Sequence, residues 1–421
     1  MTLSQKIDVK LSRAIMYYFI LQDLNFAIKS CFSLVDTPIS SLLSIGVGLI
    51  IAFIFVKNLK VVIARDKNVV RNSYLLFLVV YLISCFLSVT RGEPFLVILK
   101  ESALWTLCFW IPIGLFAYSV CDKRVLYNEV YKLSYIRSAI LLFYFLWNIL
   151  AGISAKDGHS EYSMHFSYAL ILSLLLHIDK LLRSFSWKLF LLFGIELAAI
   201  LILGSRGTLL CILSYFLIRF LVEKSSVKQK IRNILFLSVG FFILSVIAGN
   251  MDALNSVGLS SRIVAYGEAG EVTDLSGRDV LWAQTLSMIS ENPLIGYGLG
   301  GEYYSLSLFI YKMGADELVI TSTSPHNGFM EMLVCFGIPI GIFISLYIIS
   351  RIFYIRRISD ITVKSLVIIF FSVFIVPAFT VGDGIFVKPG IAFYIYLMIS
   401  IKSQYEKVKF NIRKGVSPIT Q

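Results

Sequence analysis

Three side chains far apart in the sequence could together bind a phosphate group and move a proton: Arg206, Arg278 and His326. Arg206 lies in a very short turn between two apolar runs, Leu203-Gly204-Ser205-Arg206-Gly207. An arginine held at the membrane surface costs roughly 2.5–3.5 kcal/mol if it points into lipid. We therefore expect Arg206 to face a polar cavity. The alternative is an anchor that binds lipid headgroups.

Arg278 begins a predicted helix in which Ser276 fits the N-cap position. Apolar residues recur at three- and four-residue spacing as far as Ser290, so this helix should lie on the membrane surface or pack on the spans. A guanidinium beside the free N–H groups and positive dipole end of a helix suits a phosphate ligand. The alternative is an ion pair of Arg278 with Asp279 or Asp274.

His326 follows Pro325 directly and precedes a long apolar run, so we expect it at the boundary between water and membrane. A neutral imidazole there could take the proton of an acceptor hydroxyl, an effect worth roughly 10²–10⁴ in rate. Asn327 and, one helical turn further, Glu331 are assigned to substrate binding, and Glu331 could also orient the histidine. The alternative for His326 is a capping role at the helix start.

The other motifs in the sequence do not indicate a metal site or a cofactor site. The spacing of Gly296, Gly298 and Gly301 matches GxGxxG, but these glycines follow a helix and Pro293 instead of a strand, which predicts a close-packing turn. The acidic stretch around Glu271 lacks EF-hand spacing and is typical of a solvated loop. All six cysteines lie within or beside apolar runs, with no CxxC motif, so neither zinc nor a disulfide framework is expected.

The composition identifies the setting of these residues as a lipid bilayer. The chain has 421 residues, of which 57% are hydrophobic and 15% charged, and its mean hydropathy is +0.81. Soluble domains carry about 25% charged residues, so this chain cannot coat several water-soluble cores. We expect an all-α polytopic membrane protein with about twelve transmembrane helices and one long extracytoplasmic loop that contains short helices.

We predict one integral membrane domain, 1–421, with an extracytoplasmic loop, 250–327, between spans nine and ten. A span needs about 20 apolar residues, with a range of about 17–25. The predicted spans are Ala14–Ser33, Ser40–Val56, Tyr74–Val89, Leu104–Val120, Ser134–Ile153, Met164–Ile178, Leu189–Leu203, Thr208–Val222, Ile234–Ala248, Gly328–Ile349, Leu366–Val381 and Ile391–Ile401.

The basic residues alternate along the predicted topology. One set of connections, which includes both termini, holds 28 of the 38 Lys and Arg residues, and the opposite set holds eight. Because cytoplasmic loops retain Lys and Arg, both termini should be cytoplasmic. The membrane topology thus explains the net charge of +12. The basic excess therefore does not indicate a nucleic-acid partner. Arg262, one of the eight outward cations, is a further residue that we assign to substrate binding.

Several of these segments, in this order and spacing, resemble the O-antigen ligase/polymerase family of membrane glycosyltransferases. The resemblance covers roughly Leu203 to Leu346, about a third of the chain. Its matching pieces are Gly204-Ser205-Arg206-Gly207, Gly277-Arg278 with Trp282, the run from Asn292 to Gly298, His326-Asn327 with Glu331, and the run from Gly337 to Gly341.

The resemblance implies a location in the bacterial inner membrane and a donor glycan on undecaprenyl diphosphate. It implies transfer to an acceptor hydroxyl on the outer face, with inversion at the anomeric carbon and without a metal. Arg206 and Arg278 would hold the diphosphate leaving group, and His326 would activate the acceptor. Membrane lipids and a chain-length regulator protein are the other expected partners.

Three functions remain open at this point. We prefer a polymerase that joins lipid-linked repeat units into an O-antigen or capsule-like polysaccharide. The alternative within the enzyme class is a ligase that transfers finished polymer to lipid A core. A polysaccharide or lipid transporter, from a different class, would place functional charges near the bilayer midplane, and Glu196 in the seventh predicted span is the main candidate.

Overall fold

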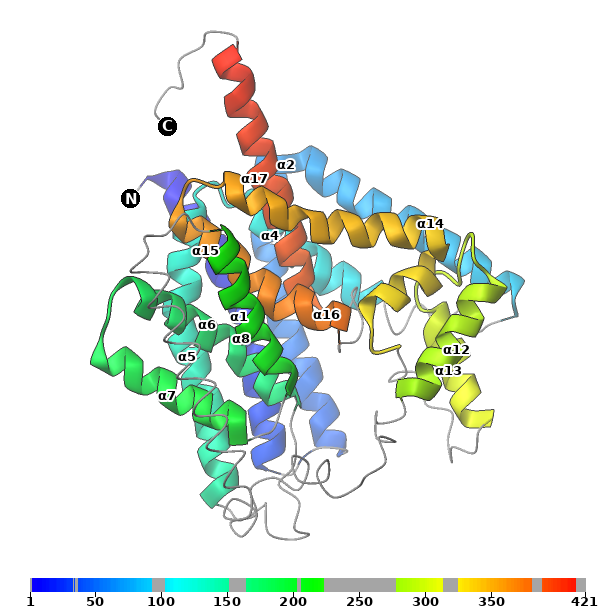
Figure 1. The fold of residues 1–421 in the computed structure, drawn as a ribbon, viewed down its shortest axis with the longest axis horizontal. Coiled ribbons are helices and arrows are strands. Elements are labelled where there is room, and N and C mark those ends of the chain that lie inside the picture. Colours follow the sequence, from blue (N-terminus) through cyan, green and yellow to red (C-terminus); the bar gives the residue numbers. More distant parts are fainter. Residues whose placement is uncertain are drawn as a thin grey trace.

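The computed structural model describes residues 2–32, 34, 37–92, 103–150, 164–202, 206–222, 278–312, 325–380 and 388–413. Within these ranges the regular secondary structure is helical and includes no strand (Figure 1). The α-helices are α1 (Leu3–Cys31), α2 (Pro38–Thr90), α4 (Ile111–Ser119), α5 (Lys123–Leu150), α6 (Met164–Arg183), α7 (Trp187–Ile202), α8 (Arg206–Val222), α12 (Arg278–Glu291), α13 (Gly301–Lys312), α14 (Gly328–Ser350), α15 (Ile361–Phe370), α16 (Val376–Thr380) and α17 (Pro389–Arg413). Two π-helical turns, η2 (Thr106–Trp110) and η5 (Phe371–Ile375), and a 3₁₀ segment, η4 (Arg351–Arg357), continue neighbouring helices.

Three helical segments of the described chain are long and apolar enough to cross a membrane: Pro38–Thr90, Gly328–Arg357 and Ile361–Thr380. Two shorter apolar helices, Thr106–Ser119 and Gly207–Val222, accompany them. The all-α character is confirmed for the described residues, and it is consistent with a polytopic membrane protein. The count of twelve spans remains a prediction, and the predicted ninth span, Ile234–Ala248, lies outside the described residues.

At two places a helix continues through charged residues beyond the predicted span. The predicted connection Lys57–Arg71 lies within α2 and contains its kink, where two helical segments meet at the non-helical backbone of Asp66 (φ −138°, ψ 47°). That stretch contains no glycine or proline, and Lys and Arg have high helix propensity. The predicted span Ile391–Ile401 lies in the first half of the longer helix α17.

Most helices share one apolar core. α1 packs against α5 and α2, α4 against α17, and α6 against α5, α7 and α8. At its centre the rings of Phe370 and Phe393 stack with their centroids 3.8 Å apart. The beginning of α1 and the end of α17 lie at the same end of the molecule (Figure 1).

One pair of opposite charges is buried inside this core. Asp23 and Arg137, on α1 and α5, form an ion pair with side chains that are 3% and 5% exposed. This pairing offsets the cost of the carboxylate that interrupts the first predicted span, because a buried charge is tolerated when it is paired.

Helices α12, α13 and α14 form a second group with a small apolar cluster of its own (Met288, Ile289, Tyr297, Leu306 and Val334). The helix predicted to begin near Arg278 and end before Asn292 is confirmed as α12. Its apolar face packs on α14, as one of the two predicted arrangements requires. The sequence predicts short helices in the loop 250–327 but does not give the bounds of α13.

Candidate functional site

Arg206 and Arg278 are each the first residue of a helix, α8 and α12 respectively. The first turn of an α-helix leaves up to four backbone N–H groups without intrahelical partners, and the helix dipole is positive there. Both arginines therefore occupy the type of position that suits an anionic ligand. The structure describes the backbone at these two residues but not their side chains. Arg262 lies outside the described residues.

One hydrogen bond joins the helix of Arg278 to the segment of His326. The indole Nε1 of Trp282, one turn into α12, donates to the carbonyl oxygen of Pro325 over 2.8 Å. α12 also packs directly on α14, the helix that His326 precedes. Of the three predicted residues, the structure thus brings the backbone of Arg278 towards His326. Arg206 is placed only as the first residue of α8.

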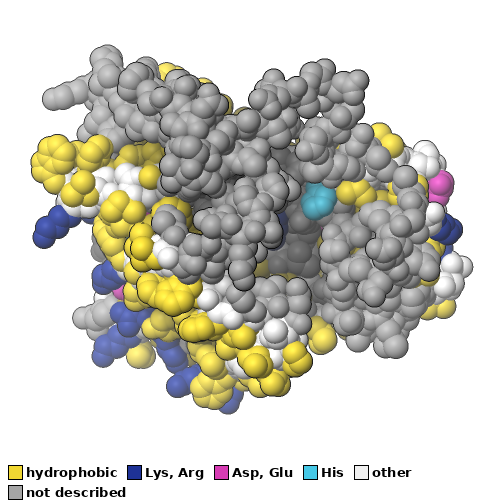
Figure 2. Space-filling model, turned by 90° about the horizontal axis from the view of Figure 1, so that it is seen from below, with side chains coloured by type: hydrophobic (Ala, Val, Ile, Leu, Met, Phe, Trp, Pro, Cys, Tyr) yellow, Lys and Arg dark blue, Asp and Glu magenta, His cyan; other side chains and the backbone are white. Residues whose placement is uncertain are grey.

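His326 has a left-handed backbone with φ +50°, which is uncommon for a residue with a side chain. Such a conformation costs roughly 1–2 kcal/mol and persists when the surrounding structure holds it in place. Here it is held between Pro325, which is bonded by Trp282, and Asn327, which caps the next helix. A histidine is visible on the face shown in Figure 2. Of the two histidines with described side chains, His326 is half-buried and His177 is fully buried.

Asn327 supplies the N-cap of α14. Its side-chain oxygen accepts hydrogen bonds from the amides of Phe329 (3.0 Å) and Met330 (3.2 Å). The capping role considered for His326 therefore belongs to its neighbour. Glu331 lies in the first turn of α14, where it is 2% exposed. A carboxylate at a helix N-terminus is favoured by the dipole, which reduces the cost of burying it.

Helix α14 is broken at Gly337, whose backbone (φ +73°, ψ 169°) is not helical. The break separates the carbonyls of Val334 and Cys335 from their usual partners four residues later. For Cys335 that partner is Pro339, which has no N–H group. In an apolar environment each unsatisfied backbone group costs several kcal/mol, so partners must come from elsewhere.

The glycine loop 293–298 provides these partners. The amides of Tyr297 and Gly298 donate to the two freed carbonyls over 2.7 and 2.8 Å, and the amide of Ile338 donates to Pro293 over 2.7 Å. The loop and the broken helix thus interlock through their backbones. The prediction of a close-packing turn for the GxGxxG match is confirmed.

Two glycines at this junction leave no space for a side chain. A Cβ atom on Gly296 (φ +73°) would lie 2.4 Å from the carbonyl oxygen of Val334. A Cβ atom on Gly337 would lie 2.4 Å from the backbone of Leu294. Both glycines are needed for positive φ and for the close approach of the two backbones.

Arg91, at the end of α2, holds the same loop and is not among the residues predicted for the site. Its guanidinium donates to the carbonyl oxygen of Tyr297 and lies 4.6 Å from the centre of that ring. The Tyr297 hydroxyl in turn donates to Glu291 over 2.9 Å. Its position in the sequence could have identified it, because Arg91 follows the outward end of a predicted span, where Lys and Arg are scarce.

With this geometry described, the chain can be compared with known protein families. Residues 189–345 match the family model described as O-antigen ligase. The resemblance to the O-antigen ligase/polymerase family is therefore confirmed over this region, which we call the O-antigen ligase-like region. It contains Arg206, Arg278, His326 and the interlocked loop. No curated protein matches the chain.

The match supports a function of the O-antigen ligase/polymerase type in general and does not separate the two activities. Within the described residues, no group of three or more His, Cys, Asp or Glu side chains could hold a metal ion.

The O-antigen ligase-like region also contains Glu196, the residue on which the transporter alternative depends. Both carboxylate oxygens of Glu196 lie 2.9 Å from His177 Nδ1, and both side chains are fully buried. The other ring nitrogen of His177 is 3.1 Å from the hydroxyl of Ser134. Ser138 donates to the same carboxylate. Glu196 is therefore fully engaged with neighbours in the bundle, as a structural carboxylate would be.

Asp179 forms a second polar cluster that the sequence does not predict. It is completely buried and accepts hydrogen bonds from Tyr127 (2.6 Å), Arg219 (2.7 Å) and Ser365 (2.7 Å). These partners come from α5, α8 and α15, so Asp179 fixes four helices relative to one another. Arg219, which lies within a predicted span, has its charge balanced here.

Proposed function

We propose that the protein polymerises undecaprenyl-diphosphate-linked oligosaccharide repeat units into a surface polysaccharide of O-antigen or capsule type. The reaction takes place at the outer face of the inner membrane, with both chain termini in the cytoplasm. The observation that carries the proposal is the Trp282–Pro325 bond inside the O-antigen ligase-like region, since it places the start of α12 beside the segment of His326.

In the proposed reaction the acceptor hydroxyl attacks the anomeric carbon of the donor glycan. His326 takes the proton of that hydroxyl as the new C–O bond forms. The bond between the anomeric carbon and the diphosphate breaks, and the electron pair leaves with undecaprenyl diphosphate. A single displacement of this kind inverts the anomeric carbon.

Arg206 and Arg278 stabilise the leaving group in this proposal. The diphosphate gains negative charge in the transition state, so fixed guanidinium groups bind it more strongly there than in the ground state. The N–H groups of the two helix starts add to the same effect. This charge stabilisation needs no metal ion. Asn327, Glu331 and Arg262 complete the proposed substrate site, in which Asn327 acts by fixing the start of α14.

Transfer of finished polymer to lipid A core is the second candidate, and the family match is equally consistent with it. A ligase and a polymerase share the donor, the leaving group and the reacting atoms, and differ in the acceptor. A chain-length regulator protein is a partner of the polymerase in this proposal and is not needed by a ligase.

Deletion of the gene in its host, followed by display of the glycans, tests the proposal. A polymerase predicts single repeat units attached to core. Undecorated core with polymer left on the carrier lipid would instead indicate a ligase, and repeat units trapped in the cytoplasm would indicate a transporter.

A further inference from the structure

We infer that a pocket between α1 and α2 binds an anionic phospholipid of the cytoplasmic leaflet. The pocket has a volume of about 390 Å³, and the described residues that line it include four cations, Lys6, Lys10, Arg13 and Lys57, and no carboxylate. This site lies outside the O-antigen ligase-like region, so it is independent of the proposed reaction. The inference rests on the orientation given by the distribution of Lys and Arg.

Helical spacing gathers the cations. Lys6, Lys10, Arg13 and Tyr17 follow one another at intervals of four, three and four residues, so they share one face of α1. Phe53 and Lys57 are four residues apart and share a face of α2. The two faces meet at the pocket.

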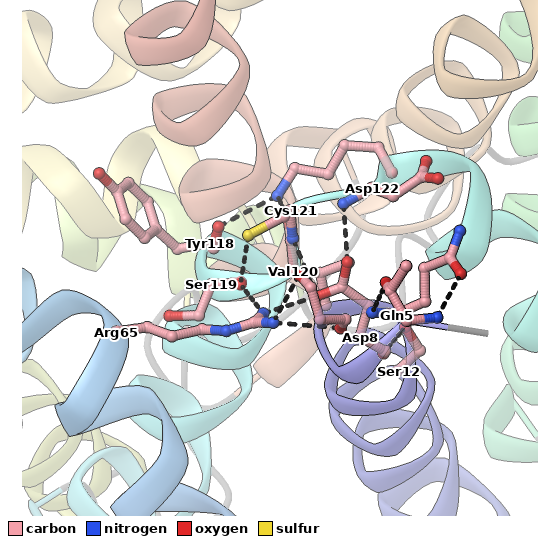
Figure 3. Close-up of polar contacts among 12 residues, drawn as sticks. Gln5, Asp8, Ser12, Arg65, Tyr118, Ser119, Val120, Cys121 and Asp122 are labelled. Carbon is pink, nitrogen blue, oxygen red and sulfur yellow. Dashed lines mark hydrogen bonds and ion pairs between the residues drawn. The ribbon is translucent and has the colours of Figure 1, made fainter. Parts of the chain in front are cut away.

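The nearby carboxylates are engaged elsewhere. Asp8, on α1, is 1% exposed and accepts from Arg65 over 2.6 Å and from the amides of Cys121 (3.1 Å) and Asp122 (2.9 Å) (Figure 3). This cluster fixes the beginning of α1 against α2 and the segment between α4 and α5. Asp8 is not among the residues that line the pocket.

Glu129, on α5, pairs with Arg13 over 2.7 Å and with Lys132 over 3.3 Å. Arg13 is therefore partly neutralised. The side chains of Lys6, Lys10 and Lys57 are exposed at the pocket, and they supply its excess positive charge.

The pocket combines this charge with an apolar wall, and the combination favours a phospholipid over a soluble phosphate. Phe53 is 69% exposed on α2, and Tyr17 is 39% exposed on α1. Basic pockets between membrane helices on the cytoplasmic side bind anionic headgroups, and an adjacent apolar surface accommodates the acyl chains. A free phosphate would use the lysines but not Phe53.

The test is native mass spectrometry of the purified full-length protein with phosphatidylglycerol and, separately, with phosphatidylcholine. We expect the wild type to retain phosphatidylglycerol preferentially. Each basic residue near an anionic headgroup changes affinity about fivefold, so K6Q/K10Q/K57Q should weaken retention on the order of a hundredfold. The charge-preserving variant K6R/K10R/K57R should retain the lipid, which separates loss of charge from loss of folding.

A matched control changes the same number of exposed lysines outside the pocket, K67Q/K180Q/K188Q, and should retain the lipid. Equal loss in the control would show a general charge effect and overturn the inference, as would undiminished retention in the pocket variant. The last measurement is competition between inorganic phosphate and phosphatidylglycerol for the pocket. Displacement of the lipid by phosphate at comparable concentration would assign the pocket to a soluble anion and also overturn the inference.

Discussion

The indole nitrogen of Trp282 donates a hydrogen bond to the carbonyl oxygen of Pro325 across 43 positions of the sequence, over 2.8 Å. One partner lies a single turn after Arg278, and the other is bonded covalently to His326. The bond therefore connects the two segments that we propose to hold the leaving group and to activate the acceptor.

Trp282→Phe tests this connection. The ring keeps its packing but loses its N–H group, which leaves the Pro325 carbonyl without this donor at a cost of about 1–3 kcal/mol. We expect shorter glycan chains, with activity reduced about tenfold or more as His326 loses its position. Glycan length on gels, together with membrane protein levels, measures the effect. Trp187→Phe, at a tryptophan that is 70% exposed, is the control and should be silent.

Arg206→Ala and Arg278→Ala should each abolish long-chain glycan and leave membrane insertion intact, because each removes a cation from the proposed diphosphate site. Arg278→Lys keeps the charge but not the bidentate geometry and should be intermediate. Chain length and membrane levels of each variant are the measurements. Near-normal polymer in both alanine variants would rule out the proposed roles.

Substitutions of His326 separate its chemistry from its backbone. Asn and Gly accept a left-handed backbone, whereas Ala does so at a cost of roughly 1–2 kcal/mol. We expect H326A, H326N and H326G all to lose long-chain glycan, while only H326A also lowers the thermal stability of the purified protein. Activity in H326N comparable to that of the wild type would show that the imidazole moves no proton.

Gly337→Ala should destabilise the interlocked loop and helix by several kcal/mol, since the new Cβ would lie 2.4 Å from the Leu294 backbone and φ is +73°. Thermal unfolding in detergent measures the loss. Gly194→Ala is the matched control, because no atom lies within 4 Å of its Cβ position inside α7. That change should be neutral or raise stability by about 0.5–1 kcal/mol.

We expect the stability of the fold to depend on pH through Asp360, at the start of α15. Burial acts to raise the pKa of this carboxyl, but donors from the Val363 amide, Arg124 and the Thr362 amide outweigh burial and hold its pKa below the usual value. A carboxyl with a lowered folded-state pKa stabilises the fold above about pH 4. That contribution is lost as the pH falls through the folded-state pKa.

Asp360→Ala should therefore lower stability by roughly 0.5–2 kcal/mol at neutral pH, the usual value of an N-cap. The difference from the wild type should shrink towards pH 3. Thermal unfolding at pH 7 and at pH 3 measures both values. A difference that is independent of pH would assign the effect to packing instead of the carboxylate.

The sequence by itself determined the all-α class, the helix that begins at Arg278, the start of α14 at Gly328 and the family resemblance. These depend on local properties, namely the length of apolar runs, capping residues and the order of motifs. Such properties do not depend on tertiary contacts. The sequence did not show that the connection Lys57–Arg71 is largely helical, because a charged stretch is compatible with both a loop and a helix.

Only the tertiary structure decided which distant groups meet. The contact of Arg91 with Tyr297, the pairing of Glu196 with His177 and the cluster around Asp179 join segments that no local pattern relates. In the sequence alone, the glycine loop resembles an ordinary turn and Gly337 resembles an ordinary helix break. They become one unit because the carbonyls that the break exposes must find donors in an apolar environment, and the loop is where those donors lie.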